Sequence, residues 1–187
     1  MLMRSGDTPP NWPRTPPIIL ALGASTVGPL LQATRTVPIV FALVADPVGA
    51  GFVHSLARPG GNATGFMSLE YGLGGKWLEL LEEIAPGATR VAVLRDSTIA
   101  SGIGQFGVIQ AMALLLKVEA NPLDIREAGD IERSIADFAR SGGSALILTV
   151  SGLAWARRDL IIKLATQYRL PAVYHERAFV AAGGLLS

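Results

Sequence analysis

Short apolar runs alternate with amphipathic segments over most of the chain. Five of these runs are too short for buried helices, and their composition is typical of strands that are buried in a parallel sheet. The five runs are Ile18–Leu22, Ile39–Ala45, Val91–Leu94, Ala145–Val150 and Ala172–Tyr174. A weaker segment, Pro122–Glu127, alternates apolar and polar residues and predicts a strand with one face toward water.

The segments between these runs have the spacing of helices. Helices are predicted over Gly74–Ala85, over Ile103–Lys117, from a cap at Asp130, and over Ala154–Tyr168. Because Ile103–Lys117 is apolar almost all round, we expect it to be packed on both sides. The alternation of strand and helix predicts right-handed βαβ units, so the fold class is α/β, with parallel sheets flanked by helices.

The alternation is interrupted once, by the turn-rich stretch Arg58–Gly65 and the glycines that follow it. We therefore predict four parts. Residues 1–17, which hold five prolines, form an irregular lead-in; residues 18–66 form a first lobe, residues 67–75 a crossover or hinge, and residues 76–187 a second lobe.

Composition excludes several classes of protein. The 187 residues include 16 Lys and Arg against 15 Asp and Glu, so the net charge of +1 predicts no nucleic-acid partner. The absence of cysteine excludes a disulfide framework, a cysteine nucleophile, thiolate metal sites and a lipoprotein anchor. The two histidines, His54 and His175, are far apart in sequence, and we predict neither a metal nor a cofactor. No membrane span or export signal is predicted.

Ligands of open α/β sheets bind beyond the carboxyl ends of the strands. The residues just after the predicted strands are small, hydroxylated or acidic, and these are the candidate site residues. They are Gly23, Ala24, Ser25, Thr26, Asp46, Pro47, Asp96, Ser97, Thr98, Ser151, Gly152, His175 and Glu176.

Each candidate also has a structural interpretation. Asp46 and Pro47 suit an N-cap and the first position of a helix, and that interpretation weighs more than direct ligand contact. Ser25, Ser97, Ser151 and Glu176 are equally possible caps, and His175 is more simply a loop residue. No dinucleotide fingerprint, P-loop, nucleophile elbow or zinc-protease motif occurs, and no nucleophile stands with a base. The residues favour binding over catalysis.

Several longer segments resemble one family. They are TVPIVFA at Thr36–Ala42, ADPVGAGFV at Ala45–Val53, LARPGGNATGF at Leu56–Phe66, and KWLELLEEIAPG at Lys76–Gly87 leading into RVAVL at Arg90–Leu94. Together they are similar to the substrate-binding components of ABC transporters, in the family that includes tryptophan- and tyrosine-binding members. The resemblance covers residues 18–187.

The resemblance implies a two-lobed fold of the type I periplasmic-binding-protein class and no enzymatic activity. The lobes would close over a small molecule, an amino acid or similar, and present it to a membrane permease. From the first lobe, Gly23, Ala24, Ser25 and Asp46 would face the cleft, with Thr64 and Gly65 near the hinge. The second lobe would contribute Ser97, Thr98, Ser101, Thr149, Ser151, His175 and Glu176. Tyr71, Phe106, Trp155 and Tyr174 are the aromatic residues placed to stack on a ligand.

The sequence also departs from the family pattern. Family members carry an export signal and further units before the first run, and further elements after the last, so we expect a chain truncated at both ends. The family is periplasmic; a chain without its signal would be cytoplasmic. A first lobe of only two strands would expose an apolar face and self-associate through it. Arg95 and Asp96 stand where relatives often carry Asn, which would alter the preference for ligand charge.

Three alternatives remain open. The chain would be a truncated fragment that no longer binds, a flavodoxin-like α/β enzyme, or the effector domain of a regulator. The last needs a helix-turn-helix, which residues 1–17 are too short and proline-rich to supply.

Overall fold

The computed structural model describes residues 18–125, 128–142 and 145–187. The predicted lead-in at residues 1–17 and the end of the predicted strand Pro122–Glu127 lie outside the described residues. The chain forms two compact units, which divide between Tyr71 and Gly72. The hinge role of residues 67–75 stays a prediction.

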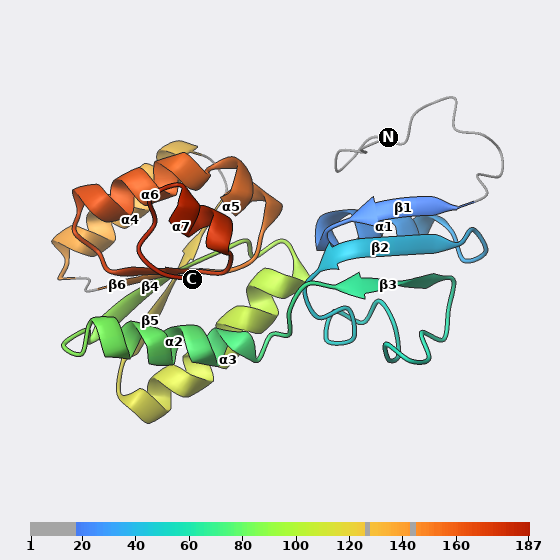
Figure 1. The fold of residues 1–187 in the computed structure, drawn as a ribbon, viewed down its shortest axis with the longest axis horizontal. Helices are drawn as coiled ribbons and strands as arrows, with labels where there is room; N and C mark the ends of the chain where they lie inside the picture. The colour runs from blue at the N-terminus through green and yellow to red at the C-terminus, as the bar shows by residue number, and fades with distance from the viewer. Residues whose placement is uncertain (1–17, 126–127, 143–144) are drawn as a thin grey trace. The chain divides into compact units, whose positions relative to one another are not determined.

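The first unit is a three-stranded parallel sheet with one helix (Figure 1). Its elements are β1 (Ile19–Leu22), α1 (Ala24–Ala33), β2 (Ile39–Val44) and β3 (Ala63–Met67). The strand order is β1-β2-β3, and Ile19, Ile39 and Ala63 are register partners across the sheet. The first unit therefore has three strands where the sequence predicts two, and β3 runs across the predicted boundary at residue 66.

Only one face of this sheet is covered by the described residues. Val27 of α1 packs with Ile19, Ile39 and Phe41 in a small core on that face. The other face carries Leu20, Leu22 and Phe66, whose exposed fractions are 65%, 37% and 75%. Parallel sheets are normally buried on both faces, so this bare apolar face is unusual.

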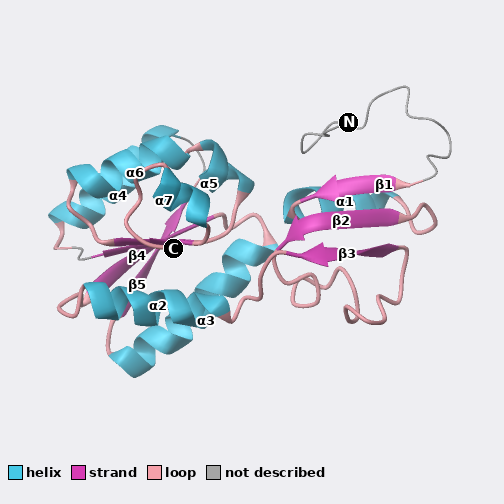
Figure 2. Cartoon of the chain, viewed as in Figure 1, coloured by secondary structure: helices cyan, strands magenta, loops and turns pink. Residues whose placement is uncertain are grey.

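The second unit is a four-stranded parallel sheet with helices on both faces (Figure 2). Its elements are α2 (Leu73–Ile84), β4 (Arg90–Arg95), α3 (Ala100–Leu116), β5 (Glu119–Asp124), α4 (Ala128–Arg140), β6 (Ala145–Leu148), α5 (Gly152–Ala156), α6 (Arg158–Gln167), β7 (Ala172–Tyr174) and α7 (Arg177–Ala181). The strand order is β5-β4-β6-β7, with α2 and α3 on one face and α4 and α6 on the other. These parallel strands and flanking helices confirm the predicted α/β class.

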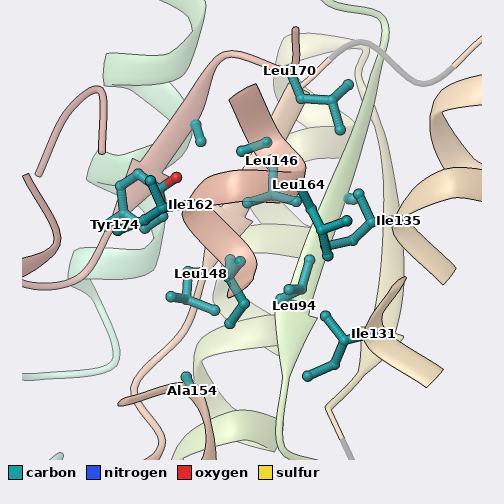
Figure 3. Packing of buried hydrophobic residues seen from close by; sticks show 14 of the residues in the cluster. Leu94, Ile131, Ile135, Leu146, Leu148, Ala154, Ile162, Leu164, Leu170 and Tyr174 are labelled. Atoms are coloured by element: carbon teal, nitrogen blue, oxygen red, sulfur yellow. The ribbon is translucent and has the colours of Figure 1, made fainter. Parts of the chain in front are cut away.

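The main core lies between this sheet and the α4–α6 layer (Figure 3). Ile131 and Ile135 of α4 and Leu164 of α6 pack on Leu94 and Leu148 of the central strands. These side chains are almost fully buried because each strand of a parallel sheet is enclosed from both faces. Trp77 of α2 and Phe138 of α4 are buried as well.

Several helices differ from the prediction. The predicted helix Ala154–Tyr168 is two helices, α5 and α6, because the backbone leaves helical geometry at Arg157 (φ −110°, ψ 14°). Asp130 lies in the first turn of α4 rather than before it, and α7 is a further short helix. Helix α3 is not enclosed on both sides by the described residues, since Ile103 and Leu114 are 55% and 77% exposed.

Candidate ligand-binding site

The order of the strands in the second unit creates a natural binding edge. From β4 the chain crosses to β5 on one side, and it then crosses back so that β6 lies on the other side of β4. Loops that leave neighbouring strands in opposite directions open a crevice at the carboxyl edge, which is where such sheets bind ligands. The edge between β4 and β6 is therefore the first place to look.

Buried polar side chains gather at this edge. Among the described residues, five polar or charged side chains belong to residues that are buried, and all five come from the segments that follow β4 and β6 or from the first half of α3. They are Asp96, Ser101, Gln105, Thr149 and Ser151, here called the buried polar cluster. Burying polar groups costs free energy unless they are paired, so their concentration at one edge indicates a functional role.

Asp96 organises the turn after β4. Its Oδ1 accepts hydrogen bonds from the backbone N–H of Thr98 at 3.0 Å and from the Thr98 hydroxyl at 2.5 Å. Helix α3 then begins directly against this turn, because Gly102 has no side chain: a Cβ there would collide with the Asp96 carbonyl oxygen. The turn and the first turn of α3 are thus fixed as one piece.

The segment after β6 is held residue by residue. Thr149 bonds to β4, its backbone N–H and its hydroxyl both donating to the Leu94 carbonyl at 3.0 Å. Val150 bonds to α3: its N–H donates to Gln105 Oε1 at 2.9 Å, and its carbonyl accepts from Ser101 Oγ at 3.3 Å. Ser151 caps α5 by accepting from the Ala154 N–H at 3.1 Å, which confirms its predicted capping role.

His175 and Glu176 follow β7, the neighbour of β6. The His175 side chain is only 6% exposed and lies against Phe179, with ring centres 5.0 Å apart. Burial lowers the pKa of His175 to about 4, and its Nδ1 has no hydrogen-bond partner among the described residues. Glu176 stands at the N-cap of α7, but its side chain makes no capping bond. His175 thus lies in the loop after β7, as predicted, but its imidazole is packed against Phe179 and is neutral at pH 7.

The aromatic candidates of this unit differ in accessibility. Tyr174 is buried and stacked on Phe179, and the ring of Phe106 lies 4.5 Å from the Arg95 guanidinium. Trp155 is 46% exposed and meets Phe179 edge to face. Trp155, the fourth residue of the helix that Ser151 caps, is the most accessible of these aromatic side chains near this edge.

In the first unit, Gly23, Ala24 and Ser25 lie at the carboxyl end of β1. Gly23 has φ +76°, a backbone conformation that favours glycine, and is the N-cap of α1. Ser25 lies inside the first turn, and no side chain caps the helix. The Thr26 hydroxyl lies 2.9 Å from the carbonyl oxygens of both Leu22 and Gly23, which share its single proton.

Asp46 lies at the carboxyl end of β2 and orders the turn after it. Its Oδ1 accepts from the Gly49 N–H at 2.7 Å, as a cap does, but the residues that follow form a turn and not the predicted helix. Its own N–H donates to the Leu69 carbonyl at 2.9 Å. Burial, with a smaller effect from the Asp46 charge, raises the pKa of nearby Tyr71 to about 12, and the Tyr71 hydroxyl has no partner among the described residues.

Thr64 does not join this group. It is the second residue of β3, opposite Val40, and its side chain is exposed. The carboxyl end of β3 is instead at Met67, because a strand occupies the stretch that the sequence predicts to be a turn. Gly65 is needed within that strand, since a Cβ there would collide with the Phe41 carbonyl oxygen.

Two surface hollows lie elsewhere. One, of about 380 Å³, is lined by Arg35, His54 and neighbouring residues of the first unit. The other, of about 410 Å³, is lined by Arg169, Tyr174 and neighbours in the second unit. Neither includes a member of the buried polar cluster. Within the described residues, no three His, Cys, Asp or Glu side chains come together to hold a metal ion.

The sheet order and the buried polar cluster define an α/β protein with a candidate ligand site at its carboxyl edge. The chain belongs to the ABC transporter substrate binding protein family, which matches residues 13–187. The resemblance inferred from the sequence segments is thereby confirmed. In the part of the chain that the structure describes, no helix combines the length and apolar character needed to cross a membrane.

Known relatives agree with this assignment. A tyrosine-binding protein of Clostridioides difficile (strain R20291) is 25% identical over 171 residues, which cover 90% of this chain and 48% of the relative. A conserved domain protein from Vibrio cholerae has the same fold, with a TM-score of 0.82, 23% identity, and coverage of 91% of this chain and 57% of that one. An ABC domain in complex with L-Trp from Streptococcus pneumonia also matches at a TM-score of 0.82, with 19% identity, 93% of this chain and 60% of that one. The chain thus spans about half the length of the curated relative it matches.

Proposed function

We propose that the chain is the substrate-binding component of an ABC-type importer and holds an amino acid or similar small molecule. The observation that carries this proposal is the buried polar cluster at the carboxyl edge between β4 and β6, in a chain of this family. The relatives' ligands, tyrosine and L-Trp, indicate the class of molecule to test first.

The groups at the edge suit such a ligand. Both bonds from Thr98 end on Asp96 Oδ1, so Oδ2, which accepts no bond from the described residues, is left for the ammonium group of an amino acid. The half-exposed ring of Trp155 offers an apolar surface for a side chain. A charged group paired with a carboxylate and a ring packed on an aromatic surface together select a zwitterion with an apolar side chain.

The remaining parts of the role are predictions from the family. These are closure of two lobes over the ligand, delivery to a permease, a location outside the cytoplasmic membrane, the absence of catalysis, and ligand contacts by the strand-end residues of the first unit. The chain spans about half of the curated relative, so each of these remains a proposal.

A thermal-shift titration of the purified chain with L-tyrosine and L-tryptophan tests the proposal. Ligand at about 100 times its dissociation constant stabilises the folded state by about 2.7 kcal/mol, which raises the melting temperature by roughly 5–10 °C. Asp96→Asn should weaken the shift, because it removes the charge that pairs with the ammonium group. Asp137→Asn, at an exposed carboxylate of α4, is the matched control and should leave the shift unchanged.

Other outcomes separate the alternatives. A cooperative melt with no shift for any amino acid would support a fragment that no longer binds. A purified chain that absorbs light as a flavin does would support a flavodoxin-like enzyme instead.

A further inference from the structure

Gln105 is the member of the buried polar cluster that lies furthest along the chain from the end of a strand. It lies inside α3 and is fully buried, although the helix around it is otherwise almost entirely apolar. An amide in such a position destabilises the fold unless its polar atoms are paired. The hydrogen bonds of its amide therefore indicate the role of Gln105.

Gln105 and Ser101 hold one residue of the segment after β6. They are four residues apart in α3 and so lie on the same face of the helix. Gln105 Oε1 accepts the Val150 N–H at 2.9 Å, and Ser101 Oγ donates to the Val150 carbonyl at 3.3 Å. Both backbone polar groups of Val150 are thus bound by side chains of α3, at a point where the β4–β6 ladder has ended.

These contacts join the two halves of the edge. The start of α3 is fixed to the Asp96 turn through the close approach at Gly102, and Val150 stands between Thr149, which is bound to β4, and Ser151, which caps α5. Through Gln105, the turn that carries Asp96 is connected to the helix that carries Trp155. The Thr149 hydroxyl joins the same segment to β4 at Leu94, whereas Gln105 and Ser101 join it to α3.

The orientation of the amide is determined by Val150. Because a backbone N–H needs an acceptor, the amide must present its oxygen, and Nε2 is then left buried without a partner. An apolar side chain of the same size would avoid that unpaired donor. The unpaired Nε2 lowers the stability of the fold, but only a hydrogen-bond acceptor at this position can bind the Val150 N–H.

We infer that Gln105 is a positioning residue for ligand binding: it fixes the segment after β6 against the Asp96 turn, so that a ligand meets both in one arrangement. This inference rests on the proposed function, because it concerns the same edge. The residue does not need to touch the ligand.

Amide hydrogen exchange of the full chain tests the connection without any ligand. Gln105→Met keeps the size of the side chain and removes the acceptor. Ile109→Val, one turn further along α3 and also fully buried, is the control with a comparable loss of stability. We expect the Val150 amide to exchange about tenfold faster in Gln105→Met and at the wild-type rate in Ile109→Val. Equal exchange in wild type and Gln105→Met would overturn the inference.

Affinity for L-tyrosine and L-tryptophan then tests the positioning role. The dissociation constant should rise about tenfold in Gln105→Met and stay unchanged in Ile109→Val. Gln105→Glu, assayed near pH 5, restores an uncharged acceptor of the same shape because burial favours the protonated carboxyl, and it should restore binding to within about twofold. Faster exchange of the Val150 amide with unchanged affinity for both amino acids would mean that Gln105 has only a structural role. That result would contradict the inference but not the proposed function. Wild-type chain that binds neither amino acid would count against both.

Discussion

Arg95 and Asp124 form an ion pair at the carboxyl ends of β4 and β5, with Nε 3.1 Å from Oδ1. The same guanidinium lies over the ring of Phe106, 4.5 Å from its centre. The charge of Arg95 is therefore engaged within its own unit. The predicted influence of Arg95 on ligand charge would have to act in competition with these two contacts.

Removing the acid of this pair should weaken the second unit slightly. Asp124→Asn leaves a largely buried guanidinium without its partner, and we expect the free energy of unfolding to fall by about 1 kcal/mol. Urea denaturation measures the change. Asp130→Asn, in an exposed pair with Arg133, should cost less than about 0.5 kcal/mol, and equal losses in the two variants would contradict the expectation.

Two glycines of α3 should respond in opposite ways to the same change. Gly102→Ala places a methyl group against the Asp96 carbonyl and should destabilise the chain by about 3 kcal/mol or more. Gly107→Ala meets nothing within 4 Å and should stabilise the helix by about 0.5–1 kcal/mol. Thermal unfolding distinguishes the two, and a tolerated Gly102→Ala would mean that α3 does not begin against the Asp96 turn.

His175 should make stability depend on pH. Burial lowers its pKa from 6.5 to about 4 in the folded chain, so the unfolded chain binds the proton first as the pH falls. The stabilisation is complete above about pH 6.5 and is lost between that pH and about 4; the full loss is about 3 kcal/mol. Denaturation at pH 7.5 and 4.5 should therefore show a steeper loss in wild type than in His175→Gln.

The exposed residue His54 provides the control for this measurement. His54→Gln should retain the wild-type difference between the two pH values. Parallel pH profiles for wild type and His175→Gln would show that His175 is not protected from protonation.

The bare face of the first sheet should drive self-association, as the sequence predicts. Its residues Leu20, Leu22, Val40, Ala42, Thr64 and Phe66 include no charged side chain, so two copies can meet there without repulsion. Light scattering should show a mass that grows with concentration, and Leu20→Lys should suppress the growth. Leu114→Lys, at a residue of α3 that is even more exposed than Leu20, should not suppress it. A mass that stays monomeric at high concentration would exclude this interface.

The sequence was most informative where strands are buried from both sides. A strand such as β7 is apolar at every position, so its bounds, Ala172–Tyr174, agree with the prediction residue for residue. Strand β3 was not predicted, because only one of its faces is covered: Ala63 is buried, while Thr64 and Phe66 are exposed. Its short alternation, interrupted by Gly65, looks like a loop until the neighbouring strand is known.

The site shows a similar limit. Position after a strand led to Asp96 and Ser151, and the family pattern added Ser101 and Thr149, four of the five residues of the buried polar cluster. Gln105 could not be found in that way, because it lies within a helix. The available signal was an amide four residues after a serine in a 17-residue helix without a charged residue, and only the position of Val150 gives that signal a meaning.

The strand order β5-β4-β6-β7 also has a consequence for the newly synthesised chain. Of the strands of the second unit, the central strand β4 is synthesised first. Each later strand then adds to an existing edge: β5 pairs with one side of β4, β6 pairs with the other side, and β7 pairs with β6. No strand has to insert between two that are already paired. The sheet can therefore form in the order of its synthesis, because each new strand pairs with a strand that is already in place.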